Sequence, residues 1–123
     1  MKLLTHNMLT SKAIKGVQTG FPLNIVVKKT KTVETEFSSE FIQRMLPKLD
    51  WPAFLKAAQT LGVGSQLPDS PPTETTDETV LRSIHHALVE VEVIEGELIC
   101  PETERKFPIS NGIPNMLLNE DEI

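Results

Sequence analysis

The hydrophobic period of this chain changes twice along its length, and this pattern limits the fold more than any other feature. From Leu23 to Lys28, apolar residues at odd positions alternate with mostly polar ones at even positions, as in a half-buried β-strand. After Val89 the chain alternates again, while the segment between these two regions has apolar residues at helical spacing. We therefore expect an α+β fold in which β structure from both ends encloses a helical middle.

Three helices are predicted in the middle part. The expected N-caps are Ser38 or Ser39 for the first helix, Asp50 for the second, and Thr75 with Glu78 as a capping box for the third. Pro47 ends or kinks the first helix, and Gly62 ends the second. The apolar stripes of these helices consist of Phe41, Ile42, Met45, Leu46 and Leu49, then Trp51, Phe54, Leu55, Ala58 and Leu61, and finally Val80, Leu81, Ile84 and Leu88.

The end segments are predicted to form short strands. "KLLT" (2–5) is taken as a short β segment, and "LVEVEVIEGELIC" (88–100) as a hairpin that turns at Glu95-Gly96. "KFPI" (106–109) and "IPNMLL" (113–118) are expected as two more strands around the turn "SNG". Their prolines favour edge positions, because proline cannot donate a ladder hydrogen bond.

Joining the two ends gives the most economical architecture. We expect residues 1–34 and 89–123 to form one small antiparallel β domain, and residues 35–88 to be a helical insertion in it. Two polar, glycine-containing stretches, 10–20 and 62–76, are expected to be loops.

The chain has a single cysteine, Cys100, which excludes an internal disulfide and a four-cysteine metal site. A lone thiol is typical of a reducing intracellular compartment. "MKLLTHNML" has too few apolar residues for a signal peptide, and no apolar run approaches the ~20 residues of a membrane span.

The net charge of −5 argues against direct binding of nucleic acid as the main function. The basic cluster "KKTK" (28–31) is interpreted as a solvated strand edge or turn. The C-terminus, "NEDEI" (119–123), is acidic.

The histidines and the cysteine give no convincing catalytic centre. His85 and His86 are adjacent on a predicted helix, so their side chains point about 100° apart and do not easily share a ligand. We expect one of them to be partly buried and the other exposed, and His6 to make a structural hydrogen bond. Cys100 would need a neighbouring base to act as a nucleophile, and the sequence places none beside it.

Other patterns for catalysis are also weak. "GVG" (62–64) follows a helix, whereas a dinucleotide-binding fingerprint follows a strand. Glu90 and Glu92 are expected on the solvent face of a strand without an acid or base partner. The chain is therefore predicted not to be an enzyme.

The most unusual feature is the density of large apolar residues near the C-terminus. Ile113, Met116, Leu117 and Leu118 are more than a terminal edge strand needs for its own core. Some of these four side chains must complete the core. An apolar edge that stays exposed promotes aggregation unless a partner covers it. Strand addition to the sheet of another protein is the physical use of such an edge.

Several motifs together resemble one eukaryotic family. They are "MKLLTHNML" (1–9), "GFPL" (20–23), "VEVIEG" (91–96), "CPET" (100–103), "KFPI" (106–109) and "GIPNMLL" (112–118). This combination, which spans nearly the whole chain, is similar to the multifunctional methyltransferase subunits, also called tRNA methyltransferase activators. The resemblance implies a zinc-ribbon-like β domain with a helical insertion. This agrees with the strand-like and helical spacing of apolar residues along the chain.

The resemblance also implies a non-catalytic, activating and stabilising subunit. Its partners would be class I S-adenosylmethionine-dependent methyltransferases that act on tRNA, small-subunit rRNA and a translation termination factor, each in a heterodimer. S-adenosylmethionine would be bound by the partner, tRNA and rRNA would be reached only through it, and no membrane would be involved. The expected location is the cytoplasm and nucleus.

The partner interface implied by the matching motifs is Asn7, Met8, Leu9, Phe107, Pro108, Ile109, Ile113, Pro114, Asn115, Met116 and Leu117. The five residues from Ile113 to Leu117 would form the docking strand, with odd and even positions divided between partner and core.

The sequence departs from the family pattern at the metal site. Zinc-binding members have two cysteines in the N-terminal loop and two in a CPxC knuckle. Here residues 10–16 contain neither cysteine nor histidine, and Thr103 stands where the second knuckle cysteine would be. We therefore expect that the zinc site is lost, and that packing of Leu3, Phe21, Phe107 and Ile109 holds the ribbon together with the partner. The alternative function, a degenerate zinc-ribbon module that binds RNA or ribosomes directly, is disfavoured by the net charge.

Overall fold

The computed structural model describes residues 1–72 and 77–123. The helices in this part are α1 (Leu3–His6), α2 (Ser39–Met45), α3 (Trp51–Thr60) and α4 (Glu78–His85). The strands are β1 (Asn24–Thr32), β2 (Val91–Ile99), β3 (Lys106–Ser110) and β4 (Ile113–Pro114). Short turns of 3₁₀-helix lie at Leu46–Lys48 and Glu120–Glu122, and a π-helical turn, His86–Glu90, joins α4 to β2.

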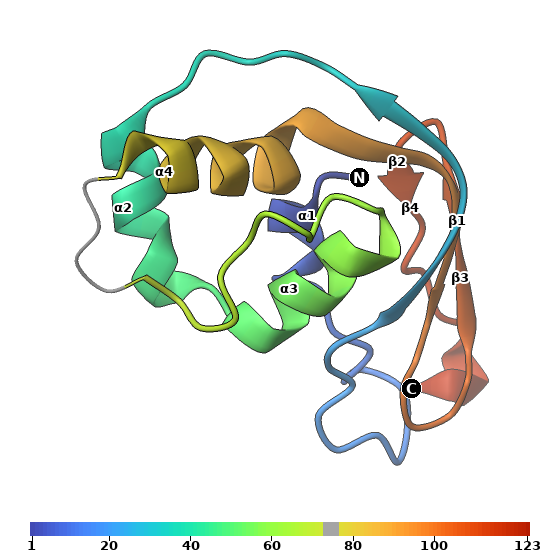
Figure 1. Ribbon diagram of the computed structural model, residues 1–123. Coiled ribbons are helices and arrows are strands. Elements are labelled where there is room, and N and C mark those ends of the chain that lie inside the picture. The colour runs from blue at the N-terminus through green and yellow to red at the C-terminus, as the bar shows by residue number, and fades with distance from the viewer. Residues whose placement is uncertain (73–76) are drawn as a thin grey trace.

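The strands form one antiparallel sheet in the order β1-β2-β3-β4. β1 comes from the first third of the chain and pairs along its length with β2 from the last third, so both ends of the chain contribute to the same sheet. Helices α2, α3 and α4 gather on one side of the molecule and the sheet on the other, with α1 between them (Figure 1). This arrangement confirms the predicted α+β architecture with three helices in the middle.

The predicted hairpin at Glu95-Gly96 is wrong, because β2 continues through this position. Gly96 lies opposite Val27 of β1 and Ile109 of β3. A Cβ atom at this position would collide with the carbonyl oxygen of Val26. The glycine therefore permits a close approach of β1, next to an irregular register, and does not make a turn. The actual connection from β2 to β3 is the segment 100–105, which we call the knuckle.

The predicted β segment at residues 2–5 is also wrong, since it forms the helical turn α1. Leu3 is fully buried against the helices, and this tertiary contact outweighs the weak local preference of so short a segment. Met1, just before the turn, still joins the sheet: its nitrogen donates to the carbonyl of Val93, and its carbonyl accepts from the amide of Val93, each at 2.8 Å.

Two of the predicted helix caps are confirmed. The Ser38 hydroxyl accepts from the Phe41 amide at 3.2 Å, and the Asp50 carboxylate accepts from the Ala53 amide at 3.0 Å. α2 ends at Met45, two residues before Pro47, as the missing donor of proline requires.

The third cap differs from the prediction. Asp77 is the N-cap of α4 and accepts from the Thr79 amide at 2.9 Å, so Glu78 is the first helical residue and is not placed for a capping box. Thr75, the predicted cap, lies outside the described residues. Gly62 follows α3 with a positive φ of 78°, as expected for a residue that ends a helix.

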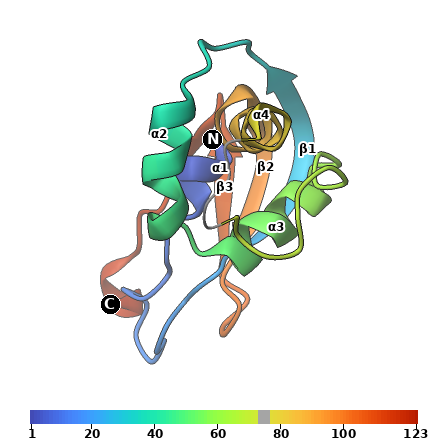
Figure 2. The same ribbon diagram turned by 60° about the vertical axis from the view of Figure 1, so that its left-hand side comes forward.

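The buried side chains form two clusters. The helical core is built from α1, α3, α4 and neighbouring residues: Leu3, Ile42, Trp51, Phe54, Ala57, Ala58, Leu67, Leu81, Ile84, Ala87, Leu88 and Val89. The sheet core comprises Met1, Ile14, Leu23, Val93, Leu98, Cys100, Phe107 and Ile109. Figure 2 shows α2, α3 and α4 grouped around α1, in front of the strands. Of the side chains predicted to hold the ribbon, Phe107 and Ile109 lie in the sheet core, Leu3 lies in the helical core, and Phe21 is half-buried.

Candidate functional site

The two outer edges of the sheet differ in chemistry. β1 forms one edge, and Lys28, Lys29 and Lys31 of this strand are all exposed. Lysines on an edge strand discourage pairing with another sheet, because pairing would bury their charges. This edge is therefore protected against strand addition.

The other edge, formed by β4 and the residues after it, exposes large apolar side chains. Ile113 is 68% exposed and Leu117 is 79% exposed. Met116 and Leu118 point the other way and pack against the sheet core. Odd and even positions of 113–118 thus divide between the surface and the core, and the apolar excess predicted from the sequence lies at an unprotected edge.

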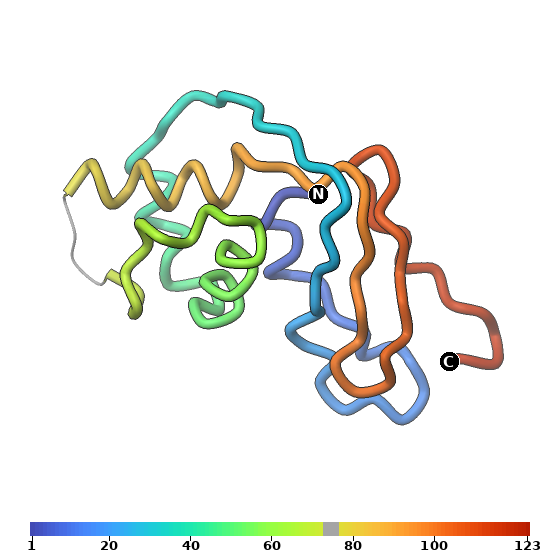
Figure 3. The backbone as a smooth tube through the Cα atoms, turned by 45° about the vertical axis from the view of Figure 1, so that its right-hand side comes forward, coloured from blue at the N-terminus to red at the C-terminus, as the bar shows by residue number. Residues whose placement is uncertain are grey.

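Only Ile113 and Pro114 of the predicted docking strand are paired as a strand. The Asn115 amide still donates to the Pro108 carbonyl at 2.9 Å, and the chain then leaves the sheet. The Asn115 side chain accepts from the Leu117 amide at 3.0 Å, which turns the backbone away from β3. Figure 3 shows the C-terminal segment departing from the strands at this point.

The N-terminal part of the predicted interface contains one exposed side chain. Met8 is 60% exposed, whereas Asn7 is buried and Leu9 packs partly against the sheet core. In β3, Phe107 and Ile109 face the sheet core, and Pro108 between them is exposed. The structure therefore places six of the predicted residues (Asn7, Leu9, Phe107, Ile109, Pro114 and Met116) under or beside the surface and five of them (Met8, Pro108, Ile113, Asn115 and Leu117) on it.

Cys100 is fully buried at the start of the knuckle. Its sulfur accepts from the Thr103 amide at 3.4 Å. Burial raises the pKa of the thiol, but hydrogen bonds from Ser11 and Thr103 outweigh this effect and leave the pKa below its ordinary value. The donors around the sulfur are hydroxyl and amide groups, which do not fit a zinc ion that prefers thiolate and imidazole ligands. Within residues 1–72 and 77–123, no group of three or more His, Cys, Asp or Glu side chains is placed to hold a metal ion.

Glu102, also in the knuckle, was not singled out by the sequence. Its carboxylate accepts from the backbone amides of Gln18, Thr19 and Gly20 at 3.0, 3.0 and 2.7 Å, and from the Thr19 hydroxyl at 3.2 Å. These donors, with the Gly20 amide first, lower the pKa of Glu102 to about 2. No local sequence pattern could have indicated this contact, because the donors lie more than 80 positions away.

The two adjacent histidines do share a partner, contrary to the expectation. The Glu90 carboxylate lies 3.0 Å from Nδ1 of His86 and 3.6 Å from Nε2 of His85. The π-helical turn that begins at His86 ends at Glu90, whose carboxylate is within reach of a ring nitrogen of each histidine. Glu90 also accepts from the Thr35 amide at 2.9 Å, the main cause of its lowered pKa, so it does not lie on the solvent face. The rest of the prediction is confirmed, with His85 buried and His86 partly exposed.

His6 makes the structural hydrogen bond that was expected. Its Nε2 lies 2.8 Å from the Leu23 carbonyl, which can only accept, so Nε2 carries the proton. Burial lowers the pKa of His6 and keeps the ring neutral.

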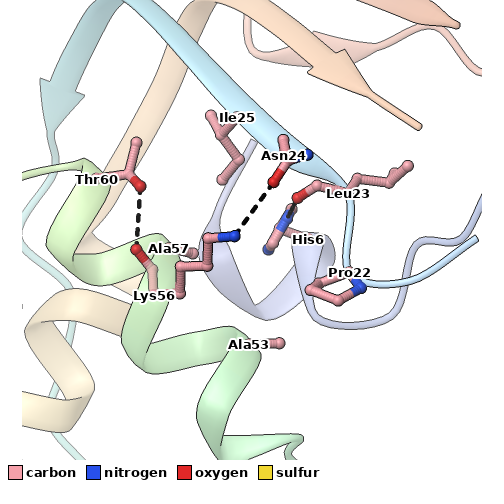
Figure 4. A pocket seen from close by; sticks show the side chains of 9 residues that line it. All are labelled: His6, Pro22, Leu23, Asn24, Ile25, Ala53, Lys56, Ala57 and Thr60. Carbon is pink, nitrogen blue, oxygen red and sulfur yellow. Dashed lines mark hydrogen bonds between the residues drawn. The ribbon is translucent and has the colours of Figure 1, made fainter. Parts of the chain in front are cut away.

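His6 lines a small pocket together with residues from β1 and α3, including Lys56 and Asn24 (Figure 4). The volume of about 70 Å³ is far below the ~300 Å³ at which ligand sites begin. This pocket cannot hold a nucleoside cofactor.

Nearly the whole chain matches one protein family. The model of the Trm112p-like protein family matches residues 2–112. The chain belongs to the Trm112p-like family. This confirms the resemblance found in the sequence motifs.

Full-length relatives of this family occur across eukaryotes. The multifunctional methyltransferase subunit TRM112-like protein of Mus musculus is 52% identical over 125 residues, which cover 99% of this chain and 98% of the relative. Homolog B of the TRM112 subunit in Arabidopsis thaliana is 48% identical and covers both chains completely. The multifunctional methyltransferase subunit TRM112 of Saccharomyces cerevisiae is 35% identical over 96% of each chain.

A solved structure of the Trm112p-like family has the same fold. A chain of the E. cuniculi Mtq2–Trm112 complex, described as responsible for methylation of the eRF1 translation termination factor, superposes with a TM-score of 0.56. The match covers 95% of each chain at 16% identity. It confirms the predicted fold class, a zinc-ribbon-like sheet with a helical insertion. Within residues 1–72 and 77–123, no helix has both the length and the apolar character needed to cross a membrane.

Proposed function

We propose that this chain is a non-catalytic subunit that binds, stabilises and activates class I S-adenosylmethionine-dependent methyltransferases. Its relatives are named multifunctional methyltransferase subunits, and the chain with the same fold comes from the Mtq2–Trm112 complex, which is described as responsible for methylation of the eRF1 translation termination factor.

One observation carries this proposal, namely the contrast between the two edges of the sheet. The β1 edge is protected by exposed lysines, whereas the β4 edge presents Ile113 and Leu117 to solvent. An apolar edge next to a short strand is suited to lie against the sheet of another protein, where backbone pairing and apolar burial act together. A partner that covers this edge would bury apolar surface of its own together with Ile113 and Leu117.

The proposed docking surface consists of the exposed members of the predicted interface: Met8, Pro108, Ile113, Asn115 and Leu117. The remaining members, Asn7, Leu9, Phe107, Ile109, Pro114 and Met116, would hold these residues in place from below or beside them. On binding, the segment after Pro114 would extend β4 along the partner's strand.

The substrates and location follow from the proposed partners. The heterodimers would act on tRNA, on small-subunit rRNA and on a translation termination factor, in the cytoplasm and nucleus. S-adenosylmethionine would be held by the catalytic partner, and RNA would be reached through it. The chain would bind no zinc, since the groups around Cys100 are amide and hydroxyl donors.

Co-expression with methyltransferases from the same organism tests the proposal. Catalytic subunits should be more soluble with this chain than alone, should co-purify with it, and should methylate their substrate only in the complex. The chain alone should bind no S-adenosylmethionine. Catalytic subunits that are equally soluble and active alone would overturn the proposal. A salt-dependent shift of labelled tRNA by the isolated chain would favour direct RNA binding instead.

A further inference from the structure

Two irregular segments of the chain lie against each other at one end of the sheet. One is the N-terminal loop, residues 10–20, and the other is the knuckle, residues 100–105, at the far end of β2 and β3 (Figures 1 and 3). Neither belongs to a helix or strand, so ladder hydrogen bonds do not hold them together. Other interactions must therefore offset the entropy cost of ordering the two segments.

The usual cross-links do not fit the residues present. A disulfide is excluded because Cys100 is the only cysteine. The neighbours of its sulfur are Ser11 and Thr103, which do not form the thiolate or imidazole set of a zinc site. Apolar packing helps only in part, through Ile14 and Val17 against the sheet core.

Glu102 makes four hydrogen bonds between the two segments. Another joins Ser11 to Cys100, and Glu122 touches both segments by accepting from the Lys15 amide and from the Arg105 side chain. Three successive backbone amides of the N-terminal loop, at Gln18, Thr19 and Gly20, point at the Glu102 carboxylate. Successive N–H groups of this kind form a concave nest that binds an anion. The left-handed backbone of Gly20, with φ of 59°, helps to turn its amide into the nest.

We propose that the Glu102 carboxylate is the main polar cross-link between these two segments, an internal anion that fixes the N-terminal loop to the knuckle in place of a metal ion. Four donors converge on it within 2.7 to 3.2 Å, and they come from three consecutive residues. Glu102 is therefore a positioning residue for both segments.

The cross-link lies between the two parts of the docking surface, namely Met8 and the exposed residues of β3 and β4. The N-terminal loop follows directly on Met8, and the knuckle leads into β3, which pairs with Ile113 of β4. Glu102 thus ties the loop after Met8 to the turn that precedes β3, while His6 and Asn7 hold the chain before Met8. The step from the cross-link to docking rests on the proposed function, whereas the cross-link itself does not.

The test compares Glu102→Gln with Glu104→Gln in the full chain. Glu104 lies in the same knuckle, is exposed, and gives the same change of charge. Amide hydrogen exchange at Gln18, Thr19 and Gly20 should be about tenfold faster in Glu102→Gln, because a charged acceptor is replaced by a weaker neutral one. It should be unchanged in Glu104→Gln. Equal exchange in both variants would overturn the proposal. Fluorescence of Trp51, buried in the helical core, confirms that each variant is folded.

Two further measurements separate an anion from other cross-links. In Glu102→Gly, acetate should restore protection of the three amides, while chloride at the same ionic strength should not; equal effects of both salts would overturn the anion nest. A chelator should leave the amides of the unmodified chain protected, and loss of protection would instead indicate a metal. These measurements need no partner, so they test the cross-link independently of the proposed function. If Glu102→Gln failed to co-purify with a methyltransferase, that result would bear only on the step from the cross-link to docking.

Discussion

Asn7 and Asp50 exchange two hydrogen bonds. The Asn7 side-chain amide donates to the Asp50 carbonyl at 3.0 Å, and the Asn7 side-chain oxygen accepts from the Asp50 amide at 3.0 Å. Asp50 is also the N-cap of α3, so Asn7 holds the start of this helix against the end of α1. A residue expected at the partner interface therefore has a role inside the chain.

Replacement of Asn7 by alanine should lower the free energy of unfolding by about 1–3 kcal/mol, because two partly buried backbone groups lose their partner. Urea unfolding followed by Trp51 fluorescence measures the change. Gln43→Ala, which removes an exposed amide from α2, is the control and should stay within about 0.5 kcal/mol of the unmodified chain. Equal effects of the two substitutions would contradict the structural role of Asn7.

Gly96→Ala should be destabilising because the new Cβ meets the Val26 carbonyl oxygen in the adjacent strand. The expected loss is about 3 kcal/mol, as for an overpacked site. Gly16→Ala provides a matched control: Gly16 has a φ of 85° but open space around it, so only backbone strain of about 1 kcal/mol applies. Thermal unfolding of both variants measures the two losses of stability. A smaller loss for Gly96→Ala than for Gly16→Ala would disprove the close approach of β1.

The Glu102 cross-link should make stability depend on pH in the acid range. The pKa of this carboxyl is about 2 in the folded chain against 4.5 ordinarily, so ionisation favours the folded state. The contribution is fully present above pH 4.5 and is lost as the pH falls toward 2. Urea midpoints of the unmodified chain and Glu102→Gln should therefore differ at pH 5 and converge near pH 2. A difference that is constant over this range would contradict the assigned cause.

Two neighbouring substitutions separate docking from folding. Leu117→Asp places a charge on an exposed side chain, so it should change the unfolding free energy by less than about 0.5 kcal/mol and abolish co-purification with a methyltransferase. Met116→Asp places the same charge against the sheet core and should lower stability by about 2 kcal/mol or more. Full co-purification of Leu117→Asp would place the docking surface elsewhere.

Much of the fold could be predicted because its causes are local. Ser38 and Asp50 cap helices through amides three residues further along the chain, and Pro47 acts on its own turn. The alternation in β1 and in residues 113–118 needs only the geometry of a strand. Such contacts are readable in sequence, since both partners lie within a few positions.

Other features depended on residues far apart in the chain. A Glu-Gly pair has the same local preference in a hairpin turn and at a close approach of two strands, and only the position of Val26 distinguishes them. Which parity of residues 113–118 faces the solvent was decided by the sheet core, against which Met116 and Leu118 pack.

By itself, the sequence determined the three helices in the middle, the alternating strands, the union of both ends in one sheet, and the family. Tertiary structure alone decided that Glu102 accepts from residues 18–20 and that Glu90 accepts from the Thr35 amide. The physical reason is that these donors lie more than 50 positions away along the chain, so only the packing of the elements brings them within hydrogen-bonding distance of the carboxylate.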